Sequence, residues 1–131
     1  MKKDIEIPEV ESVYMAAVKG FNEDLGADVW NMYIINNRSA TIDMILVVSR
    51  GEFNTQKTSV MRRSIEKMEP NSYAKVEFLT EALISFKNEF LVTFFEGNKM
   101  YETVYTFDSD SIDEMNETEI PVMGLKGILR P

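Results

Sequence analysis

DVWNMYIINNRSATIDMILVVSRG, residues 28–51, contains two apolar segments separated by a short polar patch at residues 36–39. In both segments the apolar side chains recur at every second position, a period that is typical of half-buried β-strands. The alternating positions are Trp30, Met32 and Ile34 in the first segment and Ile42, Met44, Leu46 and Val48 in the second. This stretch therefore predicts an all-β protein.

The composition limits both the size of the protein and its chemistry. The chain has 131 residues, which is the usual length of one domain, so we expect residues 1–131 to form a single domain. It contains no cysteine and no histidine. Disulfides, thiolate metal sites, cysteine nucleophiles and the Ser-His-Asp triad are thereby excluded, and so is the commonest general base.

The charge of the chain argues against several partners. Its 22 acidic and 14 basic residues give a net charge of −8, and such a surface repels phosphate backbones. We therefore expect no nucleic-acid partner. No apolar stretch approaches the length that spans a membrane, and residues 5–9 do not form the core of a signal peptide. These features favour a cytoplasmic protein without a membrane partner, and no cofactor is expected.

The clearest hairpin lies between residues 90 and 107. Gly97-Asn98 makes a two-residue turn that tolerates positive φ angles. A tight turn there fixes the pairing of the two strands on both faces. The predicted pairs are Glu96 with Lys99, Phe94 with Tyr101 and Phe90 with Tyr105 on one face, and Phe95 with Met100 and Leu91 with Val104 on the other.

Other segments are less decisive. Residues 12–18 and 57–68 fit either a helical face or a strand; the first is taken as a strand, and the second could be an irregular edge strand. The last strand is expected at 120–129, interrupted by Gly124 and Gly127. Seven or eight short strands at this spacing predict an immunoglobulin-like antiparallel β-sandwich, with a small β-barrel as the alternative.

Both faces of the 90–107 hairpin are apolar, whereas a sandwich strand normally has a polar outer face. The side chains expected to face outward are Leu91, Phe95, Met100 and Val104. An apolar outer face indicates either a surface for a protein partner or a homo-oligomer interface. The opposing interpretation is that a terminal segment or the 57–68 element covers it.

The acidic stretch 108–119 suggests a weaker alternative. Asp108, Asp110 and Glu119 match positions 1, 3 and 12 of a calcium-binding EF-hand loop. However, Ile112 offers no ligand at position 5, and Asp113 stands where the loop needs glycine. A solvated acidic loop is the simpler interpretation, and a ligand- or cation-binding module is the alternative function.

Four strings in the sequence are informative together: WNMYIIN at residues 30–36, KTSVMR at 57–62, AKVE at 74–77 and NEF at 88–90. With these strings, most of the chain resembles a family of short Bacteroidetes proteins whose members often have the label of a phenylalanyl-tRNA synthetase subunit. The label implies a nucleotide-binding enzyme of the second synthetase class or an accessory partner of that enzyme.

The synthetase label conflicts with the residues themselves. Class II synthetases bind ATP through an Arg-x-Glu motif after an aromatic residue, and here Arg50-Gly51-Glu52 follows Ser49. The glycines of residues 124–130, GLKGILR, have the wrong spacing for the second motif. Synthetase activity is therefore not expected, and we predict a non-enzymatic interaction or scaffold domain. An enzyme that uses paired carboxylates is the third hypothesis.

Overall fold

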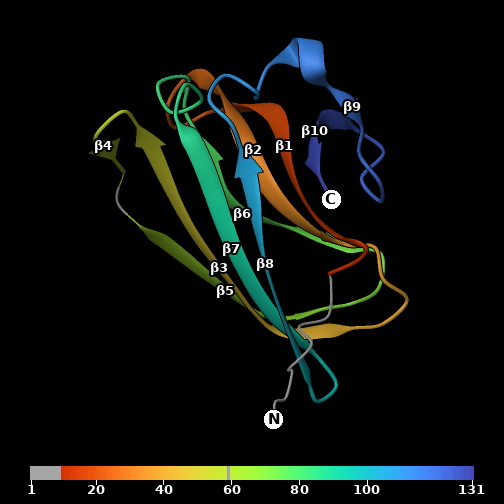
Figure 1. The fold of residues 1–131 in the computed structure, drawn as a ribbon. Helices are drawn as coiled ribbons and strands as arrows, with labels where there is room; N and C mark the ends of the chain where they lie inside the picture. The colour runs from red at the N-terminus through yellow and green to blue at the C-terminus, as the bar shows by residue number, and fades with distance from the viewer. Residues whose placement is uncertain (1–9, 59) are drawn as a thin grey trace.

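The computed structural model describes residues 10–58 and 60–131, which form two antiparallel β-sheets packed against each other (Figure 1). Its strands are β1 (Val13–Asn22), β2 (Ala27–Asn36), β3 (Ile42–Phe53), β4 (Gln56–Lys57), β5 (Met61–Met68), β6 (Ser72–Leu79), β7 (Lys87–Glu96), β8 (Lys99–Phe107), β9 (Thr118–Glu119) and β10 (Lys126–Arg130). A single 3₁₀ turn, η1 (Glu114–Asn116), is the only helical element of the described residues. None of the described helices could cross a membrane. The segment 5–9, which lacks a signal-peptide core, lies outside the described residues.

The strand order confirms the all-β prediction and excludes one alternative. The first sheet has the order β6-β2-β1-β10-β9, and the second has β4-β3-β7-β8, with β5 also paired to β3. The two sheets stay separate and open, so the small-barrel alternative is wrong. The chain crosses between the sheets after β2, β5, β6 and β8.

The hydrophobic core lies between the two sheets. Trp30, Met32 and Ile34 are buried there, which confirms the alternation predicted for the first segment. Phe90 and Phe94 are fully buried on the facing sheet, and Phe94 stacks on Tyr101 at a ring-centroid distance of 5.0 Å. Trp30 thus packs in the core and is not a ligand-stacking residue on the surface.

The alternation predicted for β3 is wrong from Met44 onwards, and of the predicted set only Ile42 lies on the buried face. Met44 has a φ of 51° and is 68% exposed, whereas the adjacent Ile45 is 1% exposed. The pairing of β3 with β7 shifts between Asp43 and Leu46, so a β-bulge adds one residue to β3. The bulge reverses the phase of the alternation. The buried residues are therefore Ile42, Ile45 and Val47, and Leu46 turns outward.

The ambiguous segments are all strands or turns. Residues 12–18 belong to β1, and most of 57–68 forms the edge strand β5. The last strand is shorter than predicted, because residues 120–125 form a turn. There the N–H of Ile120 donates to the carbonyl of Leu125 at 2.8 Å, and Gly124 has a φ of 67°.

Tyr105 ties the two sheets together in the core. Its hydroxyl donates a hydrogen bond to the backbone carbonyl of Val13 at 2.5 Å, and the tyrosine is 3% exposed. We expect Tyr105→Phe to lower the free energy of unfolding by about 1–2 kcal/mol, because the buried carbonyl loses this donor. Urea unfolding measures the change. Tyr73→Phe, at an exposed position, is the matched control, and equal losses for both variants would contradict the assignment.

Candidate interaction surface

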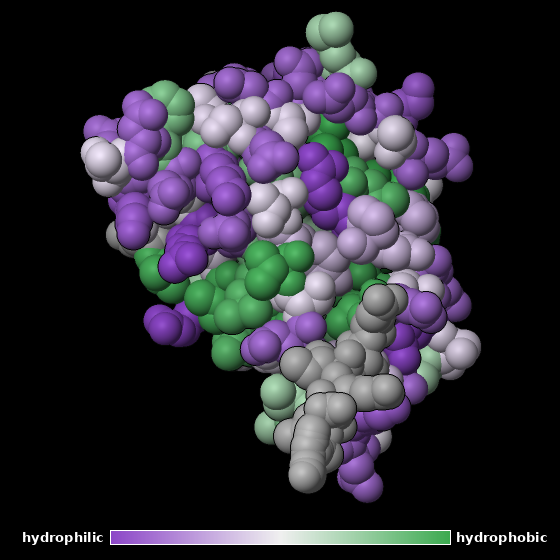
Figure 2. Space-filling model, in the orientation of Figure 1, coloured by the Kyte–Doolittle hydropathy of each residue, from purple (hydrophilic) through white to green (hydrophobic). Residues whose placement is uncertain are grey.

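The outer face of the second sheet contains a row of apolar side chains. Val48 on β3 lies opposite Leu91 on β7, and Leu91 lies opposite Val104 on β8. We call this row and its apolar neighbours on the same face the outer patch; its members are Leu46, Val48, Leu91, Phe95, Met100 and Val104. Figure 2 shows hydrophobic side chains gathered over the middle of this sheet with hydrophilic ones around them.

The structure brings the four predicted partner-binding residues onto one face. The register of β7 and β8 confirms the predicted pairs, including Leu91 with Val104 and Phe95 with Met100. Met100 and Val104 are each 53% exposed, whereas Leu91 and Phe95 are half-buried. The pair Thr93 and Glu102 lies between these two apolar pairs, so the outer patch has two parts.

The part around Leu91 is hollowed. A depression of about 360 Å³ lies over Val48, Leu91 and Val104, with Val60 at its edge. Its polar border consists of Arg50, Arg62 and Glu89. Arg50 Nε lies 3.5 Å from Glu89 Oε1, whereas Arg62 has no ion pair among the described residues.

Two of the elements that could cover this face lie elsewhere, and the N-terminal segment 1–9 lies outside the described residues. The 57–68 segment lies in the plane of the sheet, because β5 pairs with β3 along its edge. The C-terminal strand β10 belongs to the other sheet, where it pairs with β1. Among the described residues, the outer patch thus faces solvent.

The sequence pattern predicted the β7 and β8 members of the patch correctly but not those of β3. A strict period of two places Leu46 on the same face as Ile42, because it does not allow for the bulge at Met44. Positive φ at a methionine has no recognisable sequence signal, since glycine and asparagine are the residues that normally mark it.

The acidic stretch does not form a cluster. Asp108, Asp110 and Glu119 are exposed, and within residues 10–58 and 60–131 no three acidic side chains gather in a way that could hold a metal ion. Asp113 instead caps η1, accepting a hydrogen bond from the N–H of Met115 at 2.8 Å. No observation of geometry therefore favours the cation-binding alternative.

A cavity of about 200 Å³ lies between the sheets near β5 and β6, and it bears on the carboxylate-enzyme hypothesis. Among its described lining residues, Glu77 alone carries a carboxyl group. Glycoside hydrolysis requires two such groups on opposite sides of the scissile bond. The cavity therefore does not provide the constellation that this hypothesis needs.

Comparisons of the chain with protein families, with curated proteins and with solved structures found no match. The resemblance to Bacteroidetes proteins therefore stays a prediction, and so does the expectation that the chain has no synthetase activity.

Proposed function

We propose that this protein is a non-enzymatic interaction domain that self-associates through the outer patch. The observation that carries the proposal is the apolar row of Val48, Leu91 and Val104 on the solvent side of three adjacent strands. The outer face of an antiparallel sheet is normally polar, and exposed apolar patches on a soluble domain mark interaction sites.

We further propose that the scaffold is an immunoglobulin-like sandwich. The order β1-β2-β6 corresponds to strands A, B and E of that fold, and β5-β3-β7-β8 corresponds to C′, C, F and G. Strands β9 and β10 extend the first sheet beyond β1. This correspondence supports the architecture, whereas the proposed function depends on the surface of one sheet.

A second copy of the chain suits the distribution of charge around the patch. Arg62 lies on β5 at one side of the sheet, and Glu102 lies on β8 at the opposite side. Both side chains are exposed. A two-fold axis that runs parallel to the strands places β5 of one protomer over β8 of the other. Arg62 of each copy then lies near Glu102 of its partner, while the two apolar rows face each other.

The size of the face sets the expected affinity. Four strands about 4.8 Å apart and about seven residues long present roughly 400–500 Å² of flat surface. Stable complexes bury about 800 Å² of accessible surface on each partner. We therefore expect a weak dimer with a dissociation constant in the micromolar range.

Val104→Lys tests the proposal directly. The side chain is 53% exposed, so a lysine can be accommodated without disturbing the core. In the proposed dimer it would place a charge at the end of the apolar row, level with the like-charged Arg62 of the second copy. We expect sedimentation velocity to show a concentration-dependent dimer for the wild type and a monomer for this variant, with similar melting temperatures. Leu125→Lys is the control, because Leu125 is 50% exposed in the turn before β10, away from the patch. A wild type that stays monomeric at millimolar concentration would contradict the proposal.

A further inference from the structure

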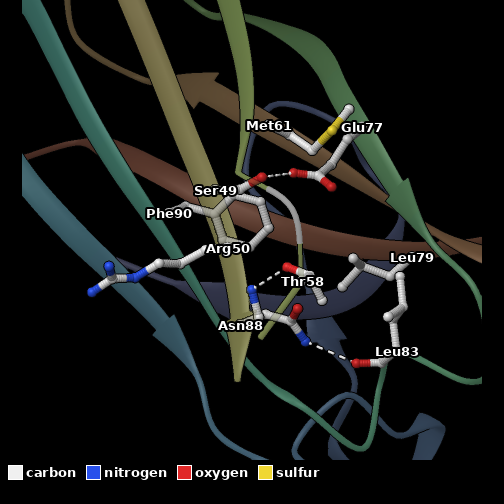
Figure 3. Close-up of a pocket in the computed structure, with 10 residues that line it drawn as sticks. Ser49, Arg50, Thr58, Met61, Glu77, Leu79, Leu83, Asn88 and Phe90 are labelled. Carbon is white, nitrogen blue, oxygen red and sulfur yellow. Dashed lines mark hydrogen bonds between the residues drawn. The ribbon is translucent and has the colours of Figure 1, made fainter. Parts of the chain in front are cut away.

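The cavity of about 200 Å³ between the sheets has apolar walls and, among its described lining residues, a single acidic group (Figure 3). Leu79, Leu83 and Phe90 supply its apolar walls. The Glu77 carboxylate accepts a hydrogen bond from the Ser49 hydroxyl across the gap between β6 and β3. We call this cavity the Glu77 pocket.

A bulge in the β2–β6 pairing explains why a carboxyl group lies between the sheets. Met32 pairs with Glu77, whereas the next residue, Tyr33, pairs with Lys75, so Val76 is the extra residue in β6. Val76 and Glu77 are both half-buried as a result. The bulge thus turns Glu77 towards the core side, where an apolar residue would normally lie.

Within residues 10–58 and 60–131, the carboxyl group of Glu77 has no cationic partner. The Arg50 side chain points away from the pocket and lies near Glu89 on the outer face. Arg62 and Arg63 border a neighbouring depression of about 30 Å³, but neither forms an ion pair with Glu77. Burial raises the pKa of Glu77, and the hydrogen bond from Ser49 opposes that shift only in part.

We propose that the Glu77 pocket binds a small apolar molecule that carries a protonated amine. The ammonium group would bond to the Glu77 carboxylate, and the hydrocarbon part would lie against Leu79, Leu83 and Phe90. A positive charge beside the carboxylate supplies a counter-ion that the described residues do not provide, and the apolar walls reduce the contact of the pair with water.

The volume of the pocket limits the ligand. A cavity of roughly 150 Å³ holds benzene in other proteins, so about 200 Å³ suits a molecule of roughly seven to ten non-hydrogen atoms. Hexylammonium has this size and combines one charge with an unbranched chain. For a ligand of seven non-hydrogen atoms we expect a dissociation constant of about 0.1–1 mM.

The test compares three probes of one length: hexylammonium, hexanol and hexanoate. Titrations followed by amide ¹H–¹⁵N spectra report which residues each probe perturbs. We expect hexylammonium to perturb Leu79, Leu83 and Phe90 and to bind at least about tenfold more tightly than hexanol. Its affinity should rise with pH as Glu77 loses its proton, because only the carboxylate pairs with the ammonium group.

Two variants separate the charge from the apolar walls. Glu77→Gln keeps the size of the side chain. It should weaken the binding of hexylammonium about tenfold and leave the affinity for hexanol unchanged. Leu83→Phe fills the pocket from a half-buried position in the 80–86 loop and should abolish binding of both hexylammonium and hexanol. The control Glu66→Gln removes an exposed carboxylate from β5 and should leave the affinities for hexylammonium and hexanol unchanged. Equal affinities for the three probes, or shifts outside the pocket, would overturn the proposal. These outcomes do not depend on the outer patch.

Discussion

Gly127→Val is expected to lower the free energy of unfolding by about 3 kcal/mol and the melting temperature by roughly 10 °C. Gly127 lies in β10 where that strand packs against β1, and a Cβ atom added to it would lie 2.4 Å from the backbone carbonyl oxygen of Ala17. Backbone atoms of a central strand cannot move aside as a flexible side chain can. The substitution must therefore push β10 away from β1.

The displacement should also loosen the contact between β10 and β8. Arg130 Nε donates to the carbonyl of Thr106 at 2.9 Å, and its guanidinium carbon lies 4.9 Å from the ring centre of Phe107. We expect limited proteolysis of the variant to release the C-terminal segment before the rest of the chain is cut. Thermal unfolding and mass spectrometry of the fragments measure the two effects.

Gly97→Asn is the control for this prediction. Gly97 has a φ of 61° in the β7–β8 turn, and nothing lies within 4 Å of an added Cβ. Asparagine tolerates that conformation, so we expect a change below about 1 kcal/mol. If the Gly127→Val variant were as stable as the Gly97→Asn variant, β10 would not lie as close to β1 as the structure shows.

The 90–107 hairpin shows what the sequence could predict. The Gly97-Asn98 turn and the alternation on both sides of it determine the register, and each predicted pair is present in the structure. The alternation of Trp30, Met32 and Ile34 likewise marks the buried side of β2. Such local signals succeed because side-chain direction along a regular strand depends only on the sequence position.

Bulges account for much of what the sequence did not reveal. At Met44 the phase of β3 reverses, and at Val76 an extra residue turns Glu77 inward. Neither position carries glycine or proline, so neither is marked in the sequence. The patch residues Leu91 and Val104 could thus be predicted from their hairpin, whereas Val48 beside them and the Glu77 pocket depend on how separate strands pair.

Reversing one of the two charges at the edges of the patch should weaken self-association, and mixing the two charge-reversed variants should restore it. Arg62→Glu places two acidic groups, the new glutamate and Glu102, opposite each other in the proposed dimer, and Glu102→Arg places two basic groups there. Like charges that face each other across an interface weaken binding strongly, so we expect each variant alone to dimerise at least about tenfold less than the wild type.

Mixing the two variants distinguishes this arrangement from other modes of association. In a mixed dimer, the glutamate of Arg62→Glu faces the arginine of Glu102→Arg, and the native Glu102 of the first chain faces the native Arg62 of the second. Both contacts are then attractive, so native mass spectrometry should show the mixed dimer as the dominant dimeric species. Lys75→Glu, an exposed position on β6 of the other sheet, changes the net charge as Arg62→Glu does and should leave dimerisation intact. A mixture that contains no more dimer than its separate components would rule out a two-fold axis along the strands, because only that axis brings β5 of one copy over β8 of the other.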